Sequence, residues 1–257
     1  MITSYLQGGL GNQLFQISAA ISLALDMGTE PVFDIKNHDL PKQGRRCDKY
    51  LETIFRNIKF SSNLSIKQVY HEPHFHYKKI DPAPNMCLVG YFQSEKYFQK
   101  HADYIREAFS IDGKTEEVIN KKYGSILDNK PVAVHVRRGD YLQLRDAHPP
   151  CSVEYYEKAM ANFPDGTTFL MFSDDISWCK ENFLRDNVVF IEKNEDIIDF
   201  YLIYMCNDVI LSNSSFSWWA AWLNNNENKR IIAPRRWFGK AMAHNTRDLI
   251  PNQWEMM

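Results

Sequence analysis

Short apolar runs alternate with stretches of helical periodicity through the second half of the chain. The runs that predict strands are residues 132–136, 167–173, 187–192, 208–212 and 229–234. The stretches that predict helices are residues 152–163, 176–183, 195–206 and 215–224. Strands and helices that alternate at this spacing are typical of a parallel sheet covered on both faces. The pattern therefore predicts a Rossmann-like α/β domain.

The first half of the chain opens with a strand, a loop, a helix and a second strand. Residues 2–6 predict the first strand and residues 7–11 a tight glycine loop. Asn12 is the expected N-cap of a helix that ends at Gly28, and a strand follows at 32–35. This βαβ order can collect anionic groups at the helix N-terminus. Later elements are expected as strands near 57–61, 67–72 and 86–91, and as a helix at 94–109.

Residues 36–85 are polar, rich in histidine and basic residues, and interrupted by prolines. They predict polar surface or the wall of an acceptor groove. His71, His74 and His76 lie close together, but their spacing is no standard zinc pattern and no cysteine accompanies them. We therefore expect no metal site in this segment.

A break at Asp112-Gly113 separates the two halves. The polar stretch 115–127 predicts a helix that leads into the strand at 132–136. We place the domain boundary near 110–115, which predicts an N-terminal domain at 1–112 and a C-terminal domain at 113–257. A last helix that packs back on the first domain is part of this prediction.

The composition is that of a soluble globular protein. Its 257 residues are 44% hydrophobic and carry a net charge of −2 without a long basic run, so we expect a small anionic ligand and no nucleic acid. Five scattered cysteines without a Cys-x-x-Cys motif fit reduced thiols. The N-terminus resembles neither a signal peptide nor a membrane anchor. These features favour a cytoplasmic protein with at most peripheral membrane association.

Polar side chains follow three of the predicted strands in the second half. The strand 132–136 is followed by Arg137, Arg138, Gly139 and Asp140. The other two polar strand ends are Ser173-Asp174-Asp175 and Ser212-Asn213-Ser214-Ser215-Phe216. The carboxyl ends of parallel strands share one edge of a sheet, and guanidinium groups, hydroxyls and helix N–H groups there suit the phosphates of a nucleotide.

Each of these features also has a plain structural alternative. Arg138 and Asp140 can form a surface ion pair while Arg137 is solvated. Residues that precede the helices can be simple N-caps, and these are Asp174, Asp175, Ser212, Asn213 and Ser214. The tryptophans at 218, 219 and 222 can suggest a sugar platform, but a helix that is apolar all round favours a place in the core.

Four segments together resemble the α-1,2-fucosyltransferases of glycosyltransferase family 11. They are Gly-Gly-Leu-Gly-Asn-Gln-Leu-Phe-Gln at 8–16, His-Val-Arg-Arg-Gly-Asp-Tyr at 135–141, Phe-Ser-Asp-Asp at 172–175 and Ser-Asn-Ser-Ser-Phe-Ser-Trp-Trp at 212–219. The resemblance implies a GT-B architecture, in which two Rossmann-like domains face each other across a cleft. It also implies an inverting transfer of L-fucose from GDP-β-L-fucose to a glycan hydroxyl, with a terminal galactose as the expected acceptor. Neither a metal nor another cofactor is expected.

The resemblance also implies roles for single residues. Arg137 is expected to hold the donor β-phosphate, and His135 and Asp199 to contact guanine. The serine motif is expected at the phosphates and the glycine loop beside the reacting centre. The further residues expected to bind the donor or the reacting groups are Gly9, Gly11, Asn12, Arg138, Asp174, Ser214, Ser215 and Phe216.

The acceptor hydroxyl needs a group that takes its proton. Related α-1,6-enzymes carry a glutamate a few residues after the arginine motif, and this chain has no direct match. Asp140 and Asp146 are the candidates, with His148 behind them, and Asp140 has the alternative role of orienting Arg137 or Arg138. Two other functions stay open, a transferase that uses a different nucleotide sugar and a catalytically silent nucleotide-sugar or glycan-binding protein. The expected location is the cytoplasm, at the inner face of a bacterial plasma membrane.

Overall fold

The computed structural model describes residues 1–35 and 47–257. Its contacts divide the chain into two units, one formed by Met1–Ser110 with His244–Pro251 and the other by Ile111–Ala243 with Asn252–Met257. Residues 36–46, part of the predicted acceptor segment, lie outside the described residues. The ranges 1–112 and 113–257 stay predictions of folding domains, because units of contact do not test independent folding.

The second unit is built on a parallel sheet of six strands in the order β11-β10-β9-β6-β7-β8. In chain order the strands are β6 (Val132–Val136), β7 (Phe169–Ser173), β8 (Val188–Phe190), β9 (Asp208–Ile210), β10 (Ile231–Ala233) and β11 (Glu255–Met256). From β6 the chain moves outward through β7 and β8, and then starts again with β9 on the other side of β6. This is the strand order of the Rossmann fold, so the predicted α/β class of this half is confirmed.

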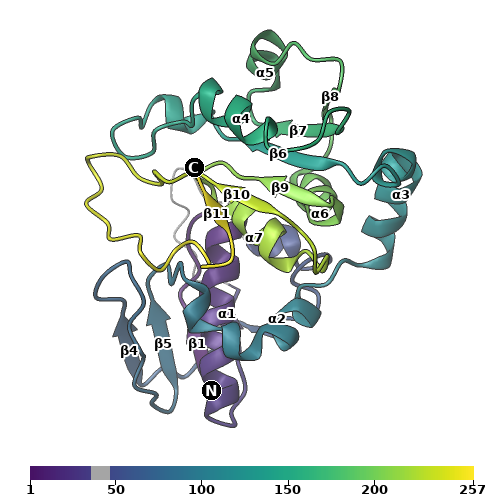
Figure 1. The fold of residues 1–257 in the computed structure, drawn as a ribbon. Coiled ribbons are helices and arrows are strands. Elements are labelled where there is room, and N and C mark those ends of the chain that lie inside the picture. The colour runs from purple at the N-terminus through teal and green to yellow at the C-terminus, as the bar shows by residue number, and fades with distance from the viewer. Residues whose placement is uncertain (36–46) are drawn as a thin grey trace. The chain divides into compact units, whose positions relative to one another are not determined.

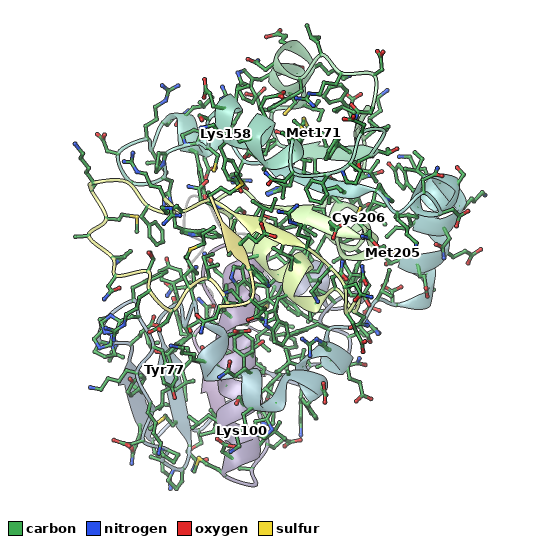
Figure 2. The ribbon with its side chains drawn as sticks, viewed as in Figure 1. Tyr77, Lys100, Lys158, Met171, Met205 and Cys206 are labelled. Carbon is green, nitrogen blue, oxygen red and sulfur yellow. The ribbon has the colours of Figure 1, made fainter. Side chains whose placement is uncertain are left out.

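Helices cover both faces of this sheet, with α4 and α5 on one side and α6 and α7 on the other (Figure 1). The helices of the unit are α3 (Gly113–Leu127), α4 (Val153–Met160), α5 (Ile176–Asn182), α6 (Asp196–Met205) and α7 (Ser215–Leu223). On the first side, alternate residues of β6 and β7 pack with α4 and α5 in a buried core that includes Val134 and Met171, the latter labelled in Figure 2. Side chains alternate along a strand, so His135 lies on the α6 and α7 side.

The apolar helix α7 is buried nearly all round. Trp218 and Trp219 are 0% exposed and Trp222 is 3% exposed. Trp218 also packs against Trp254, which precedes β11, with ring centroids 5.2 Å apart. The prediction that these tryptophans form core and no sugar platform is therefore confirmed.

The first unit contains a three-stranded parallel sheet in the order β1-β5-β4 and a separate parallel pair, β2 and β3. The strands are β1 (Ile2–Ser4), β2 (Phe33–Asp34), β3 (Phe60–Ser61), β4 (Gln68–His71) and β5 (Met86–Val89). The helices are α1 (Leu10–Asp26) and α2 (Ala102–Ala108), with short 3₁₀ turns at Cys47–Tyr50, Glu95–Tyr97 and Gln99–His101. Helix α1 is apolar on most of its surface and buried along most of its length, so it forms the centre of this unit.

Two helix predictions for the first unit need correction. Helix α1 begins at Leu10 with Gly9 as its N-cap, so Asn12 lies in the first turn and is no cap. The predicted helix at 94–109 is interrupted, because Phe98 leaves helical dihedral angles with φ −143° and ψ −4°. The Phe98 ring is fully buried and lies 6.1 Å from the Phe15 ring on α1. The burial of this aromatic side chain overrides the local helical periodicity.

The prediction of a last helix is also wrong. Residues 244–251 do belong to the first unit, but they form turns, and the chain ends in strand β11 beside β10. Side-chain contacts hold this segment, since the Asp248 carboxylate accepts the N–H of Tyr77 at 3.0 Å and the Nζ of Lys96 at 2.5 Å. No helix among the described residues combines the length and the apolar character that a membrane span needs.

Candidate active site

The six-stranded sheet of the second unit has a topological switch point between β6 and β9. Ligands of open α/β sheets bind outside the carboxyl ends of the strands at such a point. The strand register places Val136 beside Ser173, and Val134 beside Ile210. The polar residues that follow β6, β7 and β9 therefore meet at one edge of the sheet, as the sequence predicts.

Arg137 directly follows β6 and holds two carboxylates. Its Nη2 donates to Asp140 Oδ1 at 2.7 Å, and its Nη1 lies 3.0 Å from Asp174 Oδ2. Burial by itself would lower the pKa of Arg137, but Asp174 and Asp140 outweigh it and the pKa lies above its ordinary value. A guanidinium has more N–H donors than these two contacts use. Arg137 is therefore a permanent cation that can also donate to the oxygens of an anionic ligand.

Arg138 makes a different set of contacts. Its backbone N–H donates to Asp174 Oδ1 at 2.9 Å, and its Nε donates to Asp175 Oδ2 at 3.0 Å. The guanidinium lies 3.7 Å from the centre of the Trp178 ring, a cation–π contact. The alternative of an Arg138–Asp140 ion pair is therefore wrong, because Arg137 is the partner of Asp140. Arg138 instead fixes the loop that carries Arg137.

Gly139 is required by close packing in this loop. A Cβ atom at this position would lie 2.5 Å from Asp174 Oδ2. Asp174 can therefore reach both the Arg137 side chain and the Arg138 backbone only because residue 139 has no side chain. Asp175 also caps α5, since its Oδ1 accepts the N–H of Trp178 at 3.4 Å, so the capping alternative is confirmed for this residue.

His135 is buried next to the start of α7. Its Nδ1 lies 2.8 Å from Ser212 Oγ and 2.9 Å from Ser217 Oγ, and its ring centroid lies 5.6 Å from that of Phe216. Burial lowers the pKa of His135 to about 3, and the nearby Arg137 acts in the same direction. His135 is therefore neutral at physiological pH and ties the end of β6 to α7.

The N-terminus of α7 lies at this same edge. Ser214 is its N-cap residue but makes no side-chain cap hydrogen bond, so the simple capping alternative is wrong here. The Asn213 side chain is hydrogen-bonded to two loops of the same unit, since its Nδ2 donates to the carbonyls of Pro149 at 3.0 Å and Trp237 at 2.9 Å. The backbone N–H groups of the first turn of a helix attract anions. Ser214 and Ser215 at the start of α7 are thus placed to hold a phosphate.

Asp199 lies on the first turn of α6 beside Asn194. The Nδ2 of Asn194 donates to Asp199 Oδ1 at 2.8 Å. The Oδ1 of Asn194 accepts from Lys122 Nζ at 2.7 Å and Tyr123 OH at 3.0 Å. Burial raises the pKa of Asp199 to about 6, although the Asn194 hydrogen bond opposes the shift. Sequence reasoning missed Asn194, for which the only signal was its place in the loop after β8.

The glycine loop of the first unit lies at the carboxyl edge of β1. Gly8 has φ +78°, in the left-handed region, and a Cβ there would collide with Asn12 Nδ2. Asn12 Oδ1 accepts the Nε2 of Gln93 at 2.7 Å. Gln93 follows β5, and sequence reasoning missed it although it is a polar residue just after a buried strand. Gly9 and Gly11 complete the loop and the first turn of α1.

A model of a known family matches this chain from residue 1 to residue 255, and its description is glycosyl transferase family 11. The chain belongs to glycosyltransferase family 11. The match covers both units, so the two sheet edges described above are parts of one glycosyltransferase. The resemblance inferred from four short segments is confirmed.

Known members of the family are similar over most of this chain. An Escherichia coli alpha-1,2-colitosyltransferase is 31% identical and aligns with 99% of this chain and 98% of its own length. A Bos taurus galactoside alpha-(1,2)-fucosyltransferase 1 is 27% identical over 84% of this chain and 64% of its own length. These relatives indicate a sugar-transfer enzyme.

A solved structure shares the fold. The alpha-1,6-fucosyltransferase NodZ, from Bradyrhizobium, matches with a TM-score of 0.56 at 16% identity over 86% of this chain and 92% of its own. The identity is too low to carry over residue roles. The fold match, together with parallel sheets in both units, confirms the predicted GT-B class.

Two predicted site residues of this glycosyltransferase are not among the carboxylates that pair with Arg137 and Arg138. The Asp146 side chain is exposed, and its backbone carbonyl accepts the N–H of Ala241 at 2.8 Å. The His148 ring stacks on Tyr141 at 5.0 Å. Of the three predicted proton acceptors, Asp140 is the one that contacts Arg137. Within residues 1–35 and 47–257, no cluster of three or more His, Cys, Asp or Glu side chains could hold a metal ion.

Proposed function

We propose that this glycosyltransferase transfers L-fucose from GDP-β-L-fucose to a galactoside hydroxyl, with an α-1,2 linkage in the product. The observation that carries the proposal is the position of Arg137 at the switch point, where β6 is tied to the start of α7 through His135. Galactoside fucosyltransferases among the relatives, and a structural neighbour whose crystal was soaked with GDP-fucose, support the donor and the acceptor class.

The proposed chemistry is an inverting displacement without a metal ion. The acceptor oxygen attacks the anomeric carbon of fucose from the face opposite the diphosphate. The bond between that carbon and the phosphate oxygen breaks, and GDP leaves with the electron pair. Arg137 and the N–H groups at the start of α7 offset the negative charge on the departing diphosphate. The donor roles of Arg138, Asp174, Ser214, Ser215 and Phe216 belong to this proposal.

The proton of the acceptor hydroxyl passes to a carboxylate or to solvent in this mechanism. Asp140 accepts from Arg137 at 2.7 Å, so we assign it the role of orienting that guanidinium. Asp146 remains the second carboxylate that follows the arginine motif in the sequence. We assign His135 and Asp199 to guanine, because His135 is held neutral beside Phe216 and the ionised Asp199 carboxylate suits the guanine N–H groups.

A second candidate donor is GDP-colitose, because one of the relatives described above is a colitosyltransferase. Colitose is L-fucose without the 3-hydroxyl group. A site that hydrogen-bonds the 3-hydroxyl should strongly reject the sugar that lacks it, whereas an apolar wall there discriminates only weakly. The ratio of kcat/KM for the two donors therefore decides between the candidates.

The test uses the purified full chain with GDP-fucose, GDP-colitose, GDP-mannose and UDP-galactose, and a panel of terminal galactosides, in buffer that contains EDTA. We expect GDP release and a product whose linkage, measured by NMR, is α-1,2 to galactose. Transfer from UDP-galactose alone would contradict the proposal. Activity that disappears in EDTA and returns with Mn²⁺ would overturn its metal-free part.

A further inference from the structure

Buried Gln93 and half-buried Asn12 form a hydrogen-bonded amide pair in the first unit. Gln93 is 7% exposed, and its Nε2 is the donor to Asn12 Oδ1 in a bond of 2.7 Å. With Gln93 Nε2 as the donor, the Asn12 amide presents its oxygen to Gln93. The NH₂ end of Asn12 then lies against Gly8, where no Cβ is tolerated.

The glycine loop itself is held by other residues. Gln13 Nε2 donates to the Gly8 carbonyl at 2.9 Å. Gln16 accepts the N–H of Gln7 at 2.9 Å and donates to the carbonyl of Gln7 at 3.3 Å. The loop is therefore held by the hydrogen bonds of Gln13 and Gln16. Gln93 instead bonds to the Asn12 side chain.

Glu72 fixes the segment that carries Gln93. Its carboxylate accepts the N–H of Tyr91 at 2.8 Å and the N–H of Phe92 at 3.1 Å. Phe92 has φ +52°, a left-handed conformation that is strained for a non-glycine residue. At Gly90 a Cβ would collide with the Glu72 side chain. The strained turn immediately before Gln93 is thus stabilised by one carboxylate.

We propose that Gln93, held in place through Glu72, is a positioning residue that keeps the Asn12 amide turned with its N–H groups toward the glycine loop. The inference rests on the proposed function and on the place beside the reacting centre that the family resemblance implies for Asn12. With the amide in this orientation Asn12 donates a hydrogen bond to a substrate oxygen. With the amide reversed it presents a carbonyl oxygen and repels the same substrate atom.

The test is the variant Gln93→Glu in the full chain, assayed for fucosyl transfer across pH. An ionised carboxylate at 93 cannot donate to Asn12 Oδ1, whereas a protonated carboxyl group can. We expect kcat relative to wild type to fall by up to about 10²-fold at high pH and to recover as the pH is lowered. The affinity for GDP should stay that of wild type.

The ratio to wild type removes the titration of groups that both proteins share. Near position 93 these are Glu72 after β4, Tyr97, and Glu95 and Lys96 on the same segment, while α1 carries no ionisable side chain before Asp26. Gln99→Glu is the matched control, because it adds the same charge at an exposed site nearby. Its ratio should stay near one at every pH.

Two further variants keep the inference decidable if Gln93→Glu loses GDP affinity or thermal stability. Gln93→Met should be slow at every pH, and Glu72→Gln should lower kcat by a smaller factor with GDP affinity retained. A Gln93→Glu ratio that is flat with pH, or a Gln93→Met variant as fast as wild type, would overturn the inference. If wild type itself transfers no sugar from any donor, it is the proposed function that fails.

Discussion

The carboxyl edges of the two parallel sheets carry different chemistry. In the second unit two guanidinium groups and three carboxylates lie after β6 and β7, joined by contacts of 2.7 to 3.0 Å. In the first unit the edge of β1 and β5 presents the neutral amides of Asn12 and Gln93. Its carboxylate, Glu72, accepts backbone N–H groups instead of an arginine. Charge suits a departing diphosphate, whereas oriented amides suit a neutral sugar hydroxyl.

The largest expected effect comes from removing an arginine from the charged sheet edge of the second unit. Arg137→Ala should lower kcat for fucosyl transfer by about 10²- to 10³-fold, because it removes a fixed donor to the developing charge. Arg185→Ala is the matched control, since Arg185 pairs with Glu157 on α4 in the same unit, outside the cluster. Steady-state kinetics and thermal melting of both variants check this. An Arg137→Ala enzyme that is as active as wild type would remove the phosphate role of Arg137.

The next largest effect comes from displacing the Asn12 amide at the sheet edge of the first unit. Gly8→Ala and Gly166→Ala both place a side chain at positive φ, +78° and +83°, and each should lose about 1–2 kcal/mol of stability. Only at Gly8 does the new Cβ collide with Asn12, since nothing lies within 4 Å of the position at Gly166. We expect up to about 10²-fold loss of kcat for Gly8→Ala alone. Equal activity losses in the two variants would mean that backbone strain, not Asn12, is responsible.

The smallest expected effect is a dependence of GDP affinity on pH. Asp199 in the second unit has a pKa raised to about 6 by burial, so it is ionised at pH 7. If it accepts guanine N–H groups, GDP affinity should weaken toward about tenfold per pH unit below that pKa. Isothermal titration calorimetry of GDP with wild type and with Asp199→Asn, at pH values from about 5 to about 8 that bracket the shifted pKa, checks this. The pH dependence should disappear in the variant.

Stability should change in the opposite direction to GDP affinity. A carboxyl whose pKa is raised in the folded state binds its proton more tightly there than in the unfolded chain. This contribution to stability is present at low pH and is lost as the pH rises through about 6. His135 titrates far lower, with a pKa of about 3, and is not the source of either change. If GDP affinity and melting temperature fell together on acidification, Asp199 would not be the group responsible.

Some corrections to the sequence prediction have a common cause. The periodicity of residues 94–109 fits one helix, yet burying the Phe98 ring against Phe15 breaks it. The proximity of charges in the arginine motif suggests an Arg138–Asp140 pair, yet Arg137 makes that contact. Both outcomes depend on groups distant in sequence, such as Phe15, Asp174 and Asp175. Local pattern contains no information about those partners.

By itself the sequence determined the alternation of elements, the buried tryptophan helix and the polar residues that end β6, β7 and β9. These follow from local rules, since strand and helix periods, glycine loops and strand-end polarity are all written in consecutive residues. Only the tertiary structure decided the strand order with its switch point between β6 and β9, the partners of Arg137, and the Gln93–Asn12 contact. Each of these joins residues that are distant along the chain or compete for one partner, and packing in three dimensions selects among them.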